Sequence, residues 1–533
     1  MLSKLLSKLL SGFSFGRRAE RMFAEQWVAR GLESVAESDF GAARAAFESA
    51  LSCDDRHLAA MVNLAHVLRE HAGDYSRAAA HYRAALARDP GLADVQVQLG
   101  VCLYEMGDAK AALECFKNVL ERNPDHRDAG QHALFAMNAL PEVTPVDLFL
   151  AHREWARRHA DPLVRLSRKR AQGHDRPLRV AYLSGDFRDH ATLAFLEPLL
   201  ANHSRMKFEV SCYSSSPVRD AATARLQRLA QHWHDVHGVD DASVAQRIYE
   251  HGTDVVVDLS GHTRDNRLLV LARKPAAVQV SWLGYLKSTG LAAVDFRISD
   301  AVADPVGLSD AVHAERVVRL AGLMWAFEPP KDAPELAVRA PDARITFGSF
   351  NHPAKINDTV LSVWAQLLLR VPTSKLIIAG IAEDGGRERI AASLRKNGVE
   401  TARLYFYPRL PKQRFLELVA TTDVALDPFP YNGGATTCDC LWMGVPVVTL
   451  AGSHGFARSG ASLLTGAGLA GWVASSAADY VDIAARMAQD WQELAALRGA
   501  MRQRLLASEL CDVAAFARRF EDAVIEIWRG ECT

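Results

Sequence analysis

The sequence lacks the features that define several classes of protein. None of its eight cysteines forms a C-x-x-C pair, and no Cys/His quartet has zinc-site spacing. No apolar run approaches the roughly 18 residues that a membrane-spanning helix needs. Lys and Arg number 62 against 63 Asp and Glu, so the net charge of −1 disfavours a general nucleic-acid-binding surface. Free thiols in a folded chain predict a reducing compartment, and we expect a cytoplasmic protein.

What the chain does have is enough apolar sequence for several domains. It contains 533 residues, of which 49% are hydrophobic and 23% charged. At about 150 residues per domain, this length predicts three or four folded units. The first 25 residues form an amphipathic segment in which leucines recur at helical spacing between lysines. Lysines within its apolar stretch exclude a signal peptide. Residues 1–18 fit either weak membrane-surface contact or a helix that packs on the next domain or frays.

A 34-residue repeat occupies residues 26–129. Asp89-Pro90 and Asn123-Pro124 lie 34 residues apart, and Gly73-Asp74 and Gly107-Asp108 share that offset. This is the tetratricopeptide period, with a helix–turn–helix in each of about three repeats. Such arrays hold partner polypeptides in a concave groove, which favours a protein acceptor as partner. The alternative is that the repeats only support the neighbouring domain.

After the repeats, a helical connector at 130–175 leads into two series of β-branched runs that alternate with helices. The first series predicts a Rossmann-like α/β domain at 176–335, and the second predicts another at 341–533 with terminal helices. The first strand ends in LSGDF rather than in G-x-G-x-x-G, and no Walker motif follows any strand. Dinucleotide oxidoreduction and P-loop hydrolysis are therefore disfavoured. Two such halves without these motifs match the architecture of many nucleotide-sugar glycosyltransferases.

The segment DPFPYNGGATTCDCLWMGVPVVTLAG at 427–452 carries the strongest site signal. A strand ends at Asp427, and a glycine-rich loop opens a helix whose first amides can bind a pyrophosphate. The predicted donor-binding residues here are Gly433, Gly434, Ala435, Thr436 and Thr437. Asp439, one turn further on, can accept hydrogen bonds from ribose hydroxyls. An ordinary helix start with a glycine-rich turn explains the same spacing.

Three other segments follow predicted strands and supply further candidates. In GSFNHPAKIND, Lys355 can stabilise a phosphate leaving group, and Asn351 and His352 can add hydrogen bonds. In LSGDFRDHAT, His190 has the chemistry of a general base near neutral pH, or it only caps a helix. His262 in DLSGHTRDNR is expected to line the cleft near the sugar. The chain contains no D-x-D motif, which metal-dependent sugar transferases usually carry, so no metal or other cofactor is expected.

In order, the motifs SGDFRDH, DLSGHTRDNR, WLGY, SFNHPAKIND and YNGGATTCDCLWMGVPVVT resemble those of the protein O-linked N-acetylglucosamine transferase family, especially its bacterial SPINDLY-like branch. The resemblance covers residues 26–530. It implies a repeat solenoid followed by a GT-B-type pair of Rossmann-like domains. It also implies an inverting, metal-independent transfer of a sugar, most often from UDP-N-acetylglucosamine, to Ser or Thr hydroxyls of proteins.

The same resemblance assigns roles to individual residues. It makes Lys355 the residue that stabilises the diphosphate and His190 a debated cleft histidine. It places Gly434, Ala435 and Thr436 on the phosphate-binding turn. It further assigns Asp439 to ribose, Lys412 to the side of the nucleotide base, and Leu410 to backbone recognition of that base.

Some positions depart from the family pattern and leave the donor open. Ala435 replaces a common threonine, Phe415 stands where a base-contacting histidine is common, and Leu286-Lys287 replaces Pro-Gly after WLGY. Alternatives are GDP-fucose, UDP-glucose or another activated sugar as donor, or transfer to a lipid or glycan with residues 1–18 as a tether. Another is a repeat-based adaptor whose transferase half is inactive.

Overall fold

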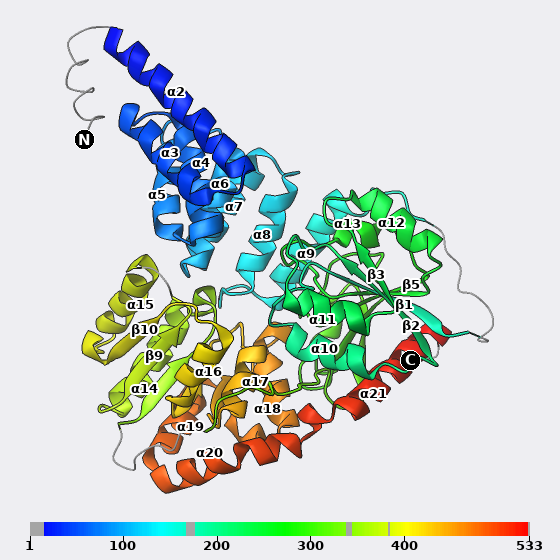
Figure 1. The fold of residues 1–533 in the computed structure, drawn as a ribbon. Helices are drawn as coiled ribbons and strands as arrows, with labels where there is room; N and C mark the ends of the chain where they lie inside the picture. Colours follow the sequence, from blue (N-terminus) through cyan, green and yellow to red (C-terminus); the bar gives the residue numbers. More distant parts are fainter. Residues whose placement is uncertain (1–14, 167–175, 337–343, 382–383, 531–533) are drawn as a thin grey trace. The chain divides into compact units, whose positions relative to one another are not determined.

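The computed structural model describes residues 15–166, 176–336, 344–381 and 384–530. The amphipathic residues 1–14 and much of the predicted interdomain linker lie outside these ranges. The chain divides into two compact units (Figure 1). One contains residues 1–136 with 381–389, and the other contains 137–380 with 390–533.

The first unit is an array of antiparallel helix pairs, as the repeat predicts. Its helices are α2 (Phe15–Ala36), α3 (Phe40–Cys53), α4 (Leu58–Val67), the π-helical turn η1 (Leu68–Ala72), α5 (Tyr75–Leu86), α6 (Ala93–Glu105), α7 (Ala109–Arg122) and α8 (Arg127–Met137). Equivalent aspartates, Asp39, Asp74 and Asp108, cap α3, α5 and α7 by accepting a backbone amide three residues on. The repeat thus places the same helix-start signal at each second helix.

Small residues let the helices of a pair approach closely. A side-chain carbon on Gly31 of α2 would overlap the ring of Phe47 on α3, and one on Gly100 of α6 would overlap Phe116 on α7. Both phenylalanines are fully buried. The two pairs therefore use the same glycine–phenylalanine contact, and the predicted tetratricopeptide-type helical array is confirmed.

The second unit begins with helix α9 (Pro145–His159) and contains two parallel sheets. The first sheet has the order β3-β2-β1-β4-β5-β6-β7. Its strands are β1 (Leu178–Ser184), β2 (Phe208–Ser214), β3 (His232–Asp235), β4 (Val255–Asp258), β5 (Val278–Ser281), β6 (Phe296–Asp300) and β7 (Arg316–Leu320). Helices α10 (Leu193–Asn202), α11 (Ala221–Leu229), α12 (Asp241–Glu250), α13 (Leu268–Ala272) and the short η2 (Asp310–Val312) connect them.

The second sheet repeats this plan in the order β10-β9-β8-β11-β12-β13. Its strands are β8 (Thr346–Ser349), β9 (Lys375–Ala379), β10 (Leu404–Tyr407), β11 (Val424–Leu426), β12 (Val447–Leu450) and β13 (Val473–Ala474). The intervening helices are η3 (Pro353–Lys355), α14 (Asp358–Arg370), α15 (Asp384–Lys396), η4 (Thr401–Arg403), α16 (Lys412–Ala420), α17 (Ala435–Trp442), η5 (Gly455–Ala457), α18 (Ser459–Gly466) and η6 (Ala470–Trp472). The predicted helical solenoid with two Rossmann-like domains is confirmed.

The final helices lie differently from the predicted domain boundary. After α19 (Ala477–Gln489), α20 (Trp491–Leu506) and η7 (Glu509–Cys511), helix α21 (Val513–Arg529) leaves the second sheet and packs on α10 and β7 of the first (Figure 1). Its Glu521 is buried and accepts hydrogen bonds from the Ser204 amide at 2.7 Å and from His203 at 3.1 Å. Amphipathic spacing identifies such a helix but does not say which domain its apolar face covers.

Within the described ranges, no helix combines the length and the apolar character needed to cross a membrane. The connector instead supplies α9, whose buried face holds His152 and Trp155.

Candidate active site at the end of the second sheet

The best-formed polar site lies where strand β11 ends. Asp427 directly follows β11 and is only 1% exposed. Its Oδ1 accepts a hydrogen bond from the Gly433 amide at 2.6 Å, and its Oδ2 accepts one from Thr449 Oγ1 on β12 at 2.7 Å. Burial raises the pKa of Asp427 to about 6, while these donors and Lys355 favour its charged form. The carboxylate therefore fixes the glycine-rich turn to the sheet.

The helix that follows this turn has a free N-terminus. Gly434 is the N-cap residue of α17, and no side chain caps the first amides. Unpaired amides at a helix start attract anions. A side-chain carbon on Gly433 would lie 2.8 Å from the hydroxyls of Thr436 and Thr437, so only glycine fits there. The turn therefore offers backbone donors and threonine hydroxyls to one small region.

Residues predicted from two separate motifs meet at this helix start. Thr436 Oγ1 donates to Asn351 Oδ1 at 3.3 Å. Asn351 follows strand β8, and the next residue, His352, accepts the Ala354 amide through Nδ1 at 3.2 Å. A small pocket at the strand ends is lined by both sets, including Asn351, Asp427, Thr436 and Thr437. The structure thus brings Asn351 to the predicted phosphate-binding turn and uses His352 to shape η3.

Lys355 ends η3 and is directed at the same turn. Its Nζ donates to the Asn432 carbonyl at 2.8 Å and lies 3.9 Å from the centre of the Tyr431 ring. Burial lowers the pKa of Lys355 to about 8, and the nearby Asp427 charge opposes that shift. A desolvated ammonium beside a free helix start is suited to stabilising a diphosphate.

Lys412, the first residue of α16, forms an ion pair with Asp439 of α17. The Lys412 ammonium donates to both Asp439 oxygens at 2.7 and 2.6 Å. The Asp439 side chain is 6% exposed, whereas that of Lys412 is 56% exposed. Burial raises the pKa of Asp439 and Lys412 opposes this. Leu410 lies half-buried two residues before α16, and Phe415 packs edge-on against Phe350. The roles of these residues toward ribose and base remain predictions.

His190 lies in the first half, between β1 and α10. Its Nδ1 is 3.0 Å from Thr192 Oγ1 and accepts the Thr192 amide at 3.4 Å. Burial lowers the pKa of His190, and Asp186 at 3.7 Å opposes the shift. The role of His190 as a general base stays a prediction.

The two halves approach each other next to the predicted phosphate-binding turn. A side-chain carbon on Gly434 would lie 4.0 Å from the Phe195 ring of α10. Arg409, before α16, is close enough to His190 to help lower its pKa. The His190 segment therefore faces the second half.

His262 does not line an open surface. It is 3% exposed, donates from Nε2 to the Thr289 carbonyl at 2.8 Å, and packs against the rings of His152, Trp155 and Tyr285. Burial lowers its pKa to about 4. The histidine that the sequence assigns to the sugar pocket is therefore a neutral core residue against α9. Strand-end position alone did not reveal that the connector covers this loop.

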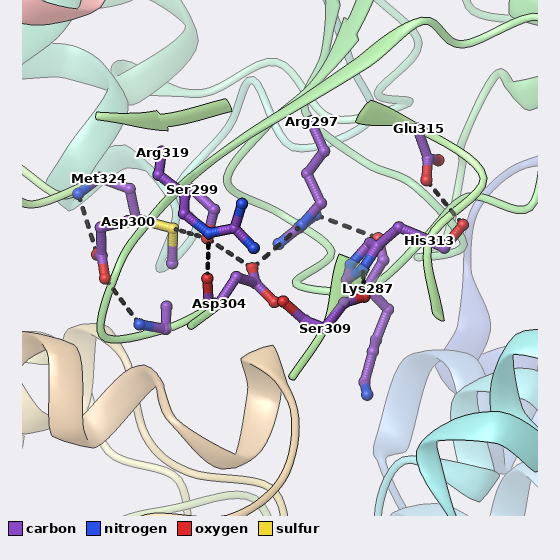
Figure 2. A network of polar contacts seen from close by, with 12 residues as sticks. Lys287, Arg297, Ser299, Asp300, Asp304, Ser309, His313, Glu315, Arg319 and Met324 are labelled. Atoms are coloured by element: carbon purple, nitrogen blue, oxygen red, sulfur yellow. Dashed lines mark hydrogen bonds and ion pairs between the residues drawn. The ribbon is translucent and has the colours of Figure 1, made fainter. Parts of the chain in front are cut away.

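Leu286-Lys287, which replaces the Pro-Gly of the family pattern, lies beside a buried polar network (Figure 2). Arg297 is fully buried, donates to the carbonyls of Tyr285 and Lys287, and lies 3.6 Å from Asp304. Lys287 is 4% exposed, and its side chain runs away from Arg297 and Asp304 (Figure 2). Burial moves its pKa well below the ordinary value. Among the described residues, its ammonium has no hydrogen-bond partner.

Sequence reasoning missed Asp427, Tyr431 and Asn432 as parts of the site. In the sequence, Asp427 stands out only as a polar residue at the end of a strand. The signal that could have identified it is its place six residues before Gly433 of the glycine-rich turn. Tyr431 and Asn432 carry no motif of their own. Within the described ranges, no group of three or more His, Cys, Asp or Glu side chains is arranged to hold a metal ion.

Comparison with known proteins agrees with this arrangement. The family described as glycosyl transferase family 41 matches residues 158–324 and 335–520, and tetratricopeptide repeat families match 28–93 and 69–136. A probable UDP-N-acetylglucosamine–peptide N-acetylglucosaminyltransferase SPINDLY of Solanum lycopersicum is 38% identical over 423 residues, which cover 78% of this chain and 45% of the relative. The chain thus spans about half the length of the curated plant relatives it matches.

A UDP-N-acetylglucosamine–peptide N-acetylglucosaminyltransferase of Caenorhabditis elegans is 24% identical over 486 residues, covering 69% of this chain and 42% of the relative. Among solved structures, a lysine-to-methionine mutant of the Thermobaculum terrenum O-GlcNAc transferase matches with a TM-score of 0.89 and 34% identity. That match covers 96% of this chain and 98% of the other. The chain therefore belongs to glycosyl transferase family 41, the family of the O-GlcNAc transferases.

Proposed function

We propose that the chain transfers a sugar, N-acetylglucosamine from UDP-N-acetylglucosamine, to Ser or Thr hydroxyls of protein acceptors. The observation that carries the proposal is the pairing of the Lys355 ammonium with the uncapped start of α17 at one turn. The names of the Solanum lycopersicum and Caenorhabditis elegans relatives state the same donor and a peptide acceptor. The tetratricopeptide repeats support a polypeptide partner.

In the proposed reaction, the acceptor hydroxyl attacks the anomeric carbon from the face opposite the diphosphate. The new C–O bond forms as the bond to the β-phosphate oxygen breaks, which inverts the anomeric centre. Lys355 and the first amides of α17 stabilise the negative charge on the departing diphosphate without a divalent cation. The hydroxyl proton passes to His190, to solvent or to a phosphate oxygen.

A donor panel tests the proposal. Thermal denaturation is followed with UDP, GDP and CMP and with their sugar conjugates. UDP-N-acetylglucosamine is expected to stabilise the second unit more than the GDP- or CMP-sugars, because ligands that bind only the folded state raise its stability. Selective stabilisation by GDP-fucose would instead identify GDP-fucose as the donor.

Transfer is then measured by intact-mass spectrometry of a Ser/Thr-rich polypeptide, with and without a chelator. A gain of one N-acetylhexosamine that survives chelation supports metal-independent transfer. A β-linkage from the α-linked donor, read from the anomeric proton by NMR, supports inversion. Tight donor binding with no transfer to any polypeptide would favour an adaptor instead.

A further inference from the structure

The buried carboxylate of Asp427 has no part in the reaction just described. Both of its oxygens are occupied by neutral donors, the Gly433 amide and the Thr449 hydroxyl. Its backbone carbonyl accepts the Tyr480 hydroxyl at 3.0 Å. A side-chain carbon on Gly460, in the first turn of α18, would lie 2.5 Å from Asp427 Oδ2. Four elements therefore enclose this carboxylate, and a charge so enclosed needs a positive partner nearby.

Lys355 is the cation that acts on Asp427. The two side chains form no direct ion pair among the described contacts, because Lys355 Nζ donates to the Asn432 carbonyl. Asp427 meanwhile holds the amide of Gly433, the next residue. The two opposite charges thus hold the two ends of one peptide group: Lys355 donates to the carbonyl of the Asn432–Gly433 bond, and Asp427 accepts its N–H. Loss of either charge changes both the shape of the turn and the potential at its amides.

The electrostatics around the pair are simple. Burial alone would discharge both groups, and each opposes that effect in the other. The other titratable groups facing the pair are Tyr431, Tyr480 and Cys440. Burial raises the pKa of all three, so they are uncharged between pH 6 and 9. His352, on the same turn as Lys355, uses Nδ1 to accept the Ala354 amide.

We propose that Asp427 is a positioning residue for the nucleotide diphosphate: it anchors the Gly433 amide and supplies the counter-charge that keeps Lys355 cationic. The inference rests on the proposed function, because it assumes that Lys355 meets a diphosphate. The proposed role of Asp427 differs from that of a purely structural anchor in how nucleotide binding depends on pH. A structural anchor affects nucleotide binding equally at every pH, whereas a counter-charge matters most where Lys355 begins to lose its proton.

Asp427→Asn separates the two roles. Asparagine keeps an oxygen for the Gly433 amide, and the Thr449 hydroxyl can turn to accept from the new amide group. UDP and GDP binding is measured by calorimetry from pH 6.5 to 9. Wild-type affinity is expected to fall above about pH 8. The variant is expected to match wild type within about 2-fold at pH 6.5 and to bind about 10-fold more weakly at pH 8.5, a shift of one pKa unit.

Two further variants sharpen the result. Asp423→Asn neutralises a fully buried carboxylate that precedes the same strand at its opposite end, where it accepts the Thr346 amide at 2.8 Å. We expect Asp423→Asn to leave the pH profile unmoved. Lys355→Arg, added to Asp427→Asn, is expected to remove the extra pH dependence because a guanidinium stays charged. If Asp427→Asn does not fold, Asp427→Ser is measured by the same criterion.

The outcomes are distinct. A profile for the Asp427 variant that runs parallel to wild type would overturn the inference and leave the proposed function standing. The same shift in Asp423→Asn would also overturn it. Wild-type protein that binds neither UDP nor GDP would refute the proposed function itself, and the inference with it.

Discussion

The two sheets place an aspartate at the same point of the same topology and use it differently. Asp258 ends β4, which pairs with β1, and Asp427 follows β11, which pairs with β8. Both are buried, both accept the amide of a glycine in the next turn, and burial raises the pKa of each to about 6. Asp427 has Lys355 beside it, whereas the second charge near Asp258 is the carboxylate of Glu315.

The segments after the two turns also differ. After Asp427 comes the eight-residue helix α17 with a free start, and after Asp258 come the buried His262 and the five-residue α13. The same carboxylate-anchored turn therefore becomes a candidate anion site only where a lysine and an open helix start accompany it. In the first half, Asp258 and the His262 that follows it are enclosed and hold the structure. In the second half, the polar groups at the strand ends remain partly open to a ligand.

The largest expected effect on stability comes from the enclosed network of the first half. Arg297→Met leaves the buried Asp304 without its cation, so we expect a loss of about 3–5 kcal/mol in the free energy of unfolding. Chemical denaturation measures this loss. The double variant Arg297→Met/Asp304→Asn should recover at least half of it. A single variant as stable as wild type would mean that the pair is not part of the structural core.

The largest effect on activity is expected in the second half. Lys355→Met removes the cation that distinguishes the Asp427 turn from the Asp258 turn. We expect turnover on a confirmed acceptor to fall by about 10²-fold or more, the scale of one preorganised electrostatic donor. Stability should fall as well, because the buried Asp427 loses its counter-charge, so turnover is compared on protein that is shown to be folded at the assay temperature. Near-normal turnover would contradict the proposed role in leaving-group stabilisation.

Sequence patterns predicted most of this arrangement because they record local requirements. Apolar, β-branched runs that alternate with helical stretches predicted both parallel sheets, and the 34-residue repeat predicted the helix pairs. That Lys355, Asn351 and the Gly433–Thr437 turn lie near one another was predictable, because each lies in the loop after a parallel strand and these strand ends share one edge of the sheet. His262 satisfied the same rule, yet α9 covers it. Which strand end stays open depends on distant segments, and α21 shows this again by packing on the first sheet.

Lys287 offers a test of intermediate size, because it is buried in the first half without a hydrogen-bond partner among the described residues. Lys287→Met should stabilise the protein by roughly 1–3 kcal/mol at pH 7, since methionine fills the space without a charge to desolvate. Burial lowers the pKa of Lys287 in the folded state. Between that pKa and about 10.4 the unfolded chain binds more protons, so wild-type stability rises with pH.

The stability gap between Lys287→Met and wild type should therefore narrow from pH 7 to pH 10, as measured by thermal denaturation. Lys274 serves as the matched lysine, because its ammonium donates to the Ala293 carbonyl at 2.8 Å and pairs with Asp295. Lys274→Met should destabilise the protein instead. If Lys287→Met were destabilising at pH 7, the ammonium would have a compensating partner and the contrast between the two lysines would fail.

The smallest expected effect concerns Lys412 and Asp439. Because the lysine side chain is 56% exposed, Lys412→Ala should change stability by less than about 1 kcal/mol. The substitution instead changes the protonation of Asp439, because burial raises the pKa of this carboxyl and Lys412 opposes that shift. Without the lysine, Asp439 takes up its proton at higher pH and then donates at that oxygen instead of accepting a ribose hydroxyl.

UDP affinity in Lys412→Ala should therefore weaken progressively as pH falls from 8 to 5.5, while the wild-type protein keeps its affinity to lower pH. Calorimetric titration over this range measures the difference, and superimposable profiles would show that Asp439 does not read the ribose through its charge.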